Sequence, residues 1–347
     1  MVRPYALMRA GFPYLKTIGE FRRVMFPSDI AIAKDGTLFS FGRGSNYGKG
    51  FSGPISITNL QDDNLGSFGW RADNLPVAEA TFMWPCQIIM DSEDNLYTSD
   101  PAVHRISSFT RDGEYLGKWG EHGSADGQLD RPSGIALDHD EDMYVVDTMN
   151  HRVQKFTKIG RFLMNWGRFG KGESEFNMPW GIAVDEFGDV YVTDWRNDRV
   201  QKFTSEGEFI FQFGHTGRGD GEFYRPAGID IDKHGDIYIV DWGNNRVQLF
   251  TQEGRYVQQF TGDATLSKST LARFFEGSGR LRRMRDYARL DQEKSFARPR
   301  SVRVDDEGHM YVPDYEHYRI QVYKKEAYPL DETEIIPPFR VPTLDAN

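Results

Sequence analysis

Three observations on this 347-residue sequence predict an all-β fold, a six-bladed β-propeller. First, three segments are close copies of one another: "RPSGIALDHDEDMYVVDTMNHRVQKF" (131–156), "MPWGIAVDEFGDVYVTDWRNDRVQKF" (178–203) and "RPAGIDIDKHGDIYIVDWGNNRVQLF" (225–250). Second, the prolines at 85, 132, 179 and 226 are spaced by 47 residues, a period typical of propellers and solenoids. Third, apolar residues alternate within each copy, which predicts short strands separated by turns. Weaker copies begin at Pro27, Pro85 and Pro299, giving six in all.

Each copy supplies strands in the same order, illustrated by 182–184, 190–192, 200–203 and 209–214. Four short strands make a propeller blade, and long helices are excluded from the repeat body. The last copy supplies only three strands, near 301–305, 310–313 and 319–323. The segment Pro13 to Pro27 matches the missing fourth strand, so Tyr14–Ile18 is expected to complete the sixth blade and close the ring. We predict one domain over 13–325 and a C-terminal tail over 326–347.

The repeated pattern "PxGIAVDxxGxVYVxDxxNxRVQ" resembles the NHL repeat, and the match runs from Pro13 to about Tyr323. The resemblance implies a six-bladed NHL propeller. It does not imply one function, because relatives include enzymes, RNA-binding modules and interaction scaffolds.

Composition narrows the class of partner. The net charge of −10 argues against nucleic acid or an anionic membrane surface as partner. The single cysteine, Cys86, excludes an internal disulfide and fits a reducing compartment. No N-terminal apolar run is long enough for a signal peptide or a membrane span. We therefore expect a cytoplasmic protein, with a protein partner left open.

Departures from the regular spacing gather on one face of the predicted ring. The interval from Pro27 to Pro85 is 58 residues and that from Pro226 to Pro299 is 73. The extra residues fall in connections that lie on the same face, which in repeat proteins usually marks the binding face. The insert 262–298 contains two helical stretches and an arginine-rich segment with Arg280, Arg282, Arg283, Arg285 and Arg289. We interpret the insert as a helical lid. The alternative is that its arginines form a patch that binds phosphate or RNA.

The glycine-rich loop "GRGSNYGKG" (42–50) is not interpreted as a phosphate-binding loop, because a strand rather than a helix follows it. It occupies the place of the short turn that follows Asp147, Asp194 or Asp241 in other blades, with Phe41 at the aspartate position. We expect a rim loop with Arg43 as its working residue. The aspartates themselves are expected to form structural ion pairs with Arg152, Arg199 and Arg246.

The residues directly after the six prolines are expected at the mouth of a central channel: Ser28, Cys86, Ser133, Trp180, Ala227 and Arg300. At the next position Asp29, Gln87 and Ser301 replace the glycine of the other blades. Aromatic residues gather opposite these polar ones: Trp180, Trp195, Trp242 and Tyr315. An apolar wall that faces a few polar groups is typical of a small-molecule pocket.

Several of these residues also have purely structural interpretations. Asp230 and Arg303 are expected to pair with each other. Cys86 is more often an inert small hydrophobe than a nucleophile. His104 and His151 hold equivalent repeat positions, which favours a structural role over metal ligation.

One enzyme family of the same fold provides a comparison, the peptidyl-α-hydroxyglycine amidating lyases. In that family histidines after the blade prolines bind zinc, and an arginine in an "HRG"-like loop holds the substrate carboxylate. The "FGRG" sequence resembles the arginine motif, which carries over to Arg43. The metal histidines are replaced by Cys86, Trp180 and Arg300, so that activity is not expected.

Two functions remain. The first is a lyase or hydrolase that acts on an anionic or aromatic small molecule at the lidded channel mouth; the second is a non-catalytic scaffold for a protein, peptide or RNA. The enzyme hypothesis is preferred, because a lid over a recessed pocket serves catalysis. Its catalytic candidates are Arg43, Asp29, Cys86 and Glu316, and its substrate-binding candidates are Arg300, Trp180, Trp195, Trp242, Tyr315 and Gln87. Whether a divalent metal lies in the channel stays open, because backbone ligands leave no trace in a sequence.

Overall fold

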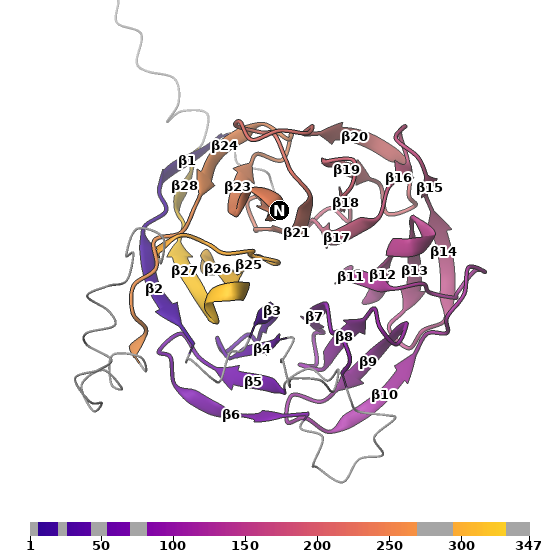
Figure 1. Cartoon of the computed structure of the whole chain (residues 1–347), viewed down its shortest axis with the longest axis horizontal. Coiled ribbons are helices and arrows are strands. Elements are labelled where there is room, and N and C mark those ends of the chain that lie inside the picture. The colour runs from indigo at the N-terminus through magenta and orange to yellow at the C-terminus, as the bar shows by residue number, and fades with distance from the viewer. Residues whose placement is uncertain (1–5, 20–25, 43–53, 70–81, 269–293, 331–347) are drawn as a thin grey trace, which may run out of the picture.

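Six four-stranded antiparallel sheets are arranged in a ring around a central axis (Figure 1). The computed structural model describes residues 6–19, 26–42, 54–69, 82–268 and 294–330. In five of the six sheets the strands are hydrogen-bonded in sequence order, from an inner strand near the axis to an outer strand at the perimeter; in the sixth the outer strand comes from the N-terminal part of the chain. The predicted all-β, six-bladed propeller is therefore confirmed.

The blades are numbered from the first repeat. Blade 1 comprises β3 (Pro27–Ile32), β4 (Leu38–Gly42), β5 (Ile55–Thr58) and β6 (Asn64–Phe68). Blade 2 comprises β7 (Gln87–Met90), β8 (Leu96–Asp100), β9 (Arg105–Phe109) and β10 (Tyr115–Trp119). Blade 3 comprises β11 (Pro132–Leu137), β12 (Asp142–Asp147), β13 (Arg152–Thr157) and β14 (Phe162–Trp166).

The remaining blades follow the same order. Blade 4 comprises β17 (Pro179–Val184), β18 (Val190–Asp194), β19 (Arg199–Phe203) and β20 (Phe209–Phe213). Blade 5 comprises β21 (Pro226–Ile231), β22 (Ile237–Asp241), β23 (Arg246–Phe250) and β24 (Tyr256–Phe260). Blade 6 comprises β25 (Arg303–Val304), β26 (His309–Asp314), β27 (Arg319–Lys324) and, from the other end of the chain, β2 (Tyr14–Ile18).

The two ends of the chain meet at two places. Strand β2 pairs antiparallel with β27, so Ile18 lies opposite Ile320 in the sixth blade. Outside that blade, β1 (Ala6–Gly11) pairs with β28 (Glu326–Leu330) in a separate two-stranded sheet. Strands β1 and β28 both lie outside the predicted domain boundaries of 13 and 325. The chain termini therefore contribute more paired backbone than the repeat pattern indicated, which leaves fewer sheet edges exposed.

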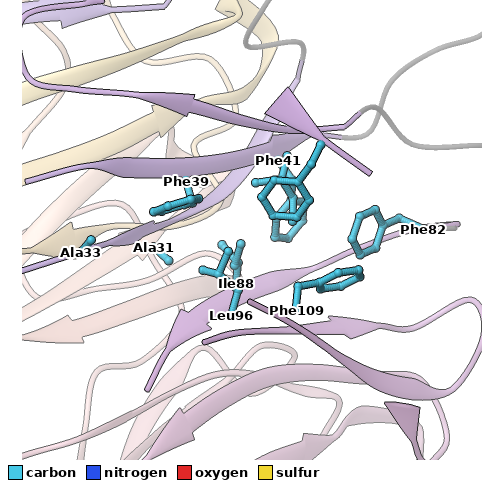
Figure 2. Packing of buried hydrophobic residues seen from close by; sticks show 10 residues of the cluster. Ala31, Ala33, Phe39, Phe41, Phe82, Ile88, Leu96 and Phe109 are labelled. Atoms are coloured by element: carbon cyan, nitrogen blue, oxygen red, sulfur yellow. The ribbon is translucent and has the colours of Figure 1, made fainter. Parts of the chain in front are cut away.

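Apolar side chains fill the spaces between neighbouring blades. Between blades 1 and 2, Phe39 and Phe41 lie close to Ile88 and Phe109, and Phe82 closes the cluster (Figure 2). The rings of Phe41 and Phe82 are stacked with centroids 6.5 Å apart. This packing explains why blade 1 carries a phenylalanine where other blades carry a buried aspartate, since an unpaired charge in this cluster would be destabilising.

Two kinds of connection share one face of the ring, as the sequence predicted. They are the turn between the second and third strands of a blade and the connection that leads into that blade from the preceding outer strand. In blade 3, Arg152 after the turn donates hydrogen bonds to the carbonyls of Ala125 and Gln128 in the connection, at 2.8 and 3.0 Å. Asn150, in the short 3-10 helix η1 (Thr148–Asn150), donates to the Gly123 carbonyl at 2.8 Å. We call this side of the ring the turn face.

The predicted helical lid falls largely on residues 269–293, and Arg43 falls on 43–53; both lie outside the described residues. The described ends of the insert are tied to the sixth blade. The backbone N–H of Asp263 donates to the Gln321 side chain at 3.0 Å, and Phe296 is buried beside Tyr323. Within the described ranges, no helix has the length and apolar character that a membrane span requires.

Candidate functional site

Repeated buried ion pairs form the base of each turn on the turn face. The carboxylates of Asp147, Asp194 and Asp241 lie 2.8, 3.0 and 2.7 Å from the guanidinium groups of Arg152, Arg199 and Arg246. Burial raises the pKa of the Asp194 carboxyl, while hydrogen bonds from the Asn177 backbone, from Asn197 and from Arg199 oppose that shift. Because these aspartates are fully enclosed, the prediction that they are structural is confirmed.

Three tryptophans on the turn face form a continuous row across blades 4 and 5, which we call the aromatic row. Trp180 is the second residue of β17, Trp195 follows β18, and Trp242 begins the 3-10 helix η2 (Trp242–Asn244). The ring centroids of Trp180 and Trp195 are 6.3 Å apart, as are those of Trp195 and Trp242. Each side chain is partly exposed. The structure therefore brings together three predicted binding residues from two neighbouring blades.

Arginine side chains lie against this row. The guanidinium of Arg225 is 4.5 Å from the Trp195 ring and that of Arg298 is 5.8 Å from the Trp242 ring. Arg196, which is exposed, contacts the Trp195 ring at 5.4 Å. A cation over an indole face is attracted by the negative face of the ring. The row is consequently cationic as well as aromatic, although the whole chain carries a net charge of −10.

The backbone holds Arg225 and Arg298 in place. Each precedes a blade proline and adopts a left-handed conformation, with φ of 59° and 51°. The N–H of Arg225 donates to the Asp198 carboxylate at 2.6 Å, and the N–H of Arg298 donates to the Asn245 side chain at 2.8 Å. These two arginines were not predicted from the sequence. The available signal was that arginine recurs before the proline in three blades.

A second aromatic–cationic contact continues the site into blade 6. The Arg300 guanidinium lies 3.9 Å from the centroid of Tyr315, and Tyr315 packs against Phe26 of blade 1 at 5.2 Å. Glu316, next to Tyr315, lies 3.2 Å from Arg298 in an exposed ion pair. Three predicted residues, Arg300, Tyr315 and Glu316, are therefore neighbours on the same face as the aromatic row.

The structure corrects the predicted roles of Asp29 and Gln87. The buried Asp29 carboxylate accepts hydrogen bonds from the Ile88 N–H at 2.9 Å, from Arg303 at 2.6 and 3.1 Å, and from Ser301. The buried Gln87 side chain accepts from the Ile135 N–H at 2.7 Å. Both side chains connect their own inner strand to the inner strand of the next blade, so these oxygens hold the ring together instead of facing a ligand.

The expected pair between Asp230 and Arg303 is also corrected. Arg303 pairs with Asp29, while an Asp230 oxygen accepts from the Val304 N–H at 2.7 Å. Burial raises the pKa of the Asp230 carboxyl to about 6, and the nearby Arg303 charge opposes the shift. A carboxyl group with a pKa near neutrality can exchange a proton at neutral pH, which sequence analysis did not anticipate for this residue.

The other predicted groups are distributed as follows. Cys86 is partly buried next to β7, and its N–H donates to the Ser99 carbonyl at 2.9 Å. A polar pocket on the turn face is lined by Lys171, Arg196, Asn197, Arg199 and Thr216. It adjoins the aromatic row through Arg196 and adds lysine and arginine side chains to that end of the site.

A group able to hold a metal ion occurs among the described residues, but not on the inner strands. His104, His122 and Asp130 lie close together, in the turn after β8 and in the connection from β10 to β11. The Nδ1 atom of His104 accepts the Arg131 N–H at 3.1 Å, and His151 accepts the Met178 N–H at 3.0 Å. This bond gives His151 the structural role that its repetition predicted, whereas His104 makes the same bond and also lies beside His122 and Asp130.

Comparisons with known proteins support the fold. A family model described as a 6-bladed beta-propeller matches residues 181–272, and one described as the SMP-30/Gluconolactonase/LRE-like region matches 120–214. No curated protein is detectably similar in sequence.

Several solved structures resemble most of the chain. A catalytically inactive virginiamycin B lyase from Staphylococcus aureus, solved with quinupristin, is 15% identical over 92% of this chain and 89% of its own, with a TM-score of 0.56. A streptogramin B lyase is 12% identical over 91% of this chain and 98% of its own, with a TM-score of 0.57. A protein of unknown function from Bacteroides thetaiotaomicron is 16% identical over 92% and 77%, with a TM-score of 0.61. At these identities the likeness establishes the shared propeller fold.

Proposed function

We propose that this propeller is an enzyme of the lyase or hydrolase type that acts on a small anionic substrate with an aromatic or planar group. The substrate would bind on the turn face, over the aromatic row and its arginines. The observation that carries this proposal is the Arg225 guanidinium, 4.5 Å from Trp195, in the middle of a row that continues to Trp180 and Trp242.

The chemistry of the row fits such a substrate. Three partly exposed indole rings offer stacking surface to a planar group, because aromatic rings pack well in offset or tilted arrangements. Arg225 and Arg298 offer N–H donors to a carboxylate or phosphate, which a guanidinium can bind in bidentate fashion. Glu316 offsets part of the positive charge of Arg298. Arg225 is therefore a stronger anion-binding candidate than Arg298.

The reaction type has indirect support. Propellers of similar fold include lyases, and part of the chain matches the SMP-30/Gluconolactonase/LRE-like family model. Both elimination and ester or lactone hydrolysis develop negative charge on oxygen, which arginine stabilises. Proton transfer would fall to Glu316, which pairs with Arg298 beside the row, or to Cys86. Arg43 remains a candidate from sequence alone.

One observation favours the alternative, a non-catalytic NHL-type scaffold that binds a partner on this face. Asp29 and Gln87, two of the predicted polar site groups, are used in contacts between blades. The described part of the turn face is consequently richer in binding groups than in groups that transfer protons.

Turnover on a defined set of substrates distinguishes the two functions. The purified chain would be incubated with quinupristin, δ-gluconolactone and 4-nitrophenyl benzoate, and the products identified by mass spectrometry. The enzyme proposal expects turnover of at least one probe, strongly reduced in Trp195→Ala and Arg225→Met. The control is Phe187→Ala, an exposed aromatic between β17 and β18 on the opposite face. Binding of a probe without turnover by any form of the protein would favour the scaffold, and turnover unaffected by both variants would reject the site.

A further inference from the structure

We infer that His104, His122 and Asp130 form a binding site for a divalent transition-metal ion of the zinc class. This site is separate from the aromatic row and does not depend on the proposed enzyme function. His104 lies in the turn between β8 and β9, while His122 and Asp130 lie in the connection from β10 to β11. A parallel bridge between His122 and Leu129 closes this connection on itself, which brings His122 next to Asp130. All three residues belong to the turn face.

The ligand atoms of the three groups lie within 4.8 Å of one another, and the two separations from Asp130 are close to those of metal ligands. An Asp130 oxygen lies 3.4 Å from Nδ1 of His104 and 3.7 Å from Nε2 of His122. Two ligand atoms on a tetrahedral ion, each bound at about 2.1 Å, are about 3.4 Å apart. Both distances are too long for a good hydrogen bond. The imidazole rings themselves have centroids 4.2 Å apart.

In the next two blades, the residues at positions equivalent to His104 and His122 make different side-chain contacts. After blade 3, His151 packs against Phe169 with ring centroids 5.0 Å apart, an apolar contact. After blade 4, Thr216 donates a hydrogen bond to Asp198 at 2.7 Å. His104 accepts the same backbone hydrogen bond as His151, but among these three copies only the one after blade 2 places two imidazole groups beside a carboxylate. A bound cation could accept a lone pair from each of the three groups at once.

Coordination through Nδ1 of His104 requires the loss of one hydrogen bond. That atom accepts the Arg131 N–H at 3.1 Å. Arg131 is exposed, so water can replace the acceptor once the lone pair of Nδ1 is directed at the metal. The exchange is therefore a change of partner at the surface, and no buried donor is left unsatisfied.

The donor set selects the kind of ion. Two imidazoles and one carboxylate suit Zn²⁺, Co²⁺, Ni²⁺ or Fe²⁺, whereas Ca²⁺ and Mg²⁺ prefer oxygen ligands throughout. Three protein ligands leave at least one coordination position for water or an exogenous ligand. The side chain of His122 is 64% exposed, so this open position would face solvent.

Metal titration tests the site directly. The full chain, freed of metal with a chelator, would be titrated calorimetrically with Zn²⁺, and Co²⁺ binding followed by visible absorption. We expect saturable binding of about one ion per chain and the intense absorption of low-symmetry, four- or five-coordinate Co²⁺. Two variants copy the next blade, which carries Phe169 and Asn177 at these positions. His122→Phe and Asp130→Asn should fold normally and weaken Zn²⁺ binding at least about tenfold.

The matched control is His215→Phe, an exposed histidine in the equivalent connection after blade 4 that contacts Glu222. It should bind Zn²⁺ as the unmodified chain does. Absence of saturable Zn²⁺ binding, or unchanged affinity in folded His122→Phe, overturns the inference. Loss of binding in His215→Phe to the same extent would show nonspecific surface binding and overturns it as well.

Discussion

The guanidinium of Arg303 lies 2.6 Å from the buried carboxylate of Asp29, although the two residues are 274 positions apart in the chain. Arg303 belongs to the inner strand of blade 6 and Asp29 to that of blade 1. The pair therefore joins the last and first blades near the axis, while β2 joins them at the perimeter. Asp29 also accepts from the Ile88 N–H, so one carboxylate connects three consecutive blades.

Removing one partner of this pair should destabilise the ring strongly. Arg303→Met leaves the fully buried Asp29 carboxylate without its counter-ion, and loss of one partner of a buried pair typically costs about 3–5 kcal/mol. The free energy of unfolding in urea measures this change. Lys268→Met is the control, because its ion pair with Asp63 is exposed and should contribute less than about 1 kcal/mol. Equal losses in both variants would contradict the role of Asp29 assigned here.

Asp230 should make stability depend on pH in the acid range. Its folded-state pKa of about 6 lies above the ordinary 3.8, so the folded chain holds this proton more tightly than the unfolded chain. Because folding favours the protonated carboxyl, the contribution of Asp230 to the free energy of unfolding decreases as pH rises from about 4 to about 6. Asp230→Asn cannot ionise. The difference in unfolding free energy between Asp230→Asn and the unmodified chain should shift by about 2 kcal/mol in favour of the variant as pH rises across this window. Above the window the difference should be constant. A difference that does not change between pH 4 and 7 would contradict this environment for Asp230.

Glycine at the second position after the blade proline should be required for stability where neighbouring inner strands are in contact. A Cβ on Gly181 would overlap the backbone carbonyl of Ala227 in the next blade. Gly181→Ala should therefore destabilise the chain by about 1–3 kcal/mol, since a backbone contact can relax only by moving a strand. Gly117→Ala in the outer strand β10 is the control, because no heavy atom lies within 4 Å of its added Cβ. Thermal unfolding compares the two, and an equally small effect at both sites would rule out close packing of the inner strands.

Much of the fold could be predicted from the sequence, because a repeated alternation of apolar residues determines each blade. The aspartate–arginine pairs and the shared face of the turns were predicted from repetition for the same reason. The β1–β28 sheet was not, because neither strand belongs to a repeat. Phe41 could be recognised as a departure, but its packing on Phe82 depends on a neighbouring blade (Figure 2).

The site was predicted less completely, since it depends on the direction of side chains across blades. Asp29 and Gln87 departed from the glycine pattern, which suggested ligand contacts. Their oxygens instead accept hydrogen bonds from the backbone of the next inner strand. No local sequence pattern encodes such a contact between blades. Arg225 and Arg298 were missed because their stacking depends on the left-handed backbone before each proline. The three tryptophans were identified correctly as neighbours, since they follow equivalent repeat positions.

Binding of a simple planar anion tests the central claim most directly, that the aromatic row with its arginines is a ligand site. Calorimetric titration would compare 2-naphthoate with the uncharged 2-naphthamide, using the unmodified chain, Arg225→Met, Trp195→Ala and the opposite-face control Phe187→Ala. We predict that 2-naphthoate binds more tightly than the amide, that both site variants weaken its binding at least about tenfold, and that Phe187→Ala does not. Equal binding of acid and amide, or affinity unchanged in Arg225→Met and Trp195→Ala, would contradict it.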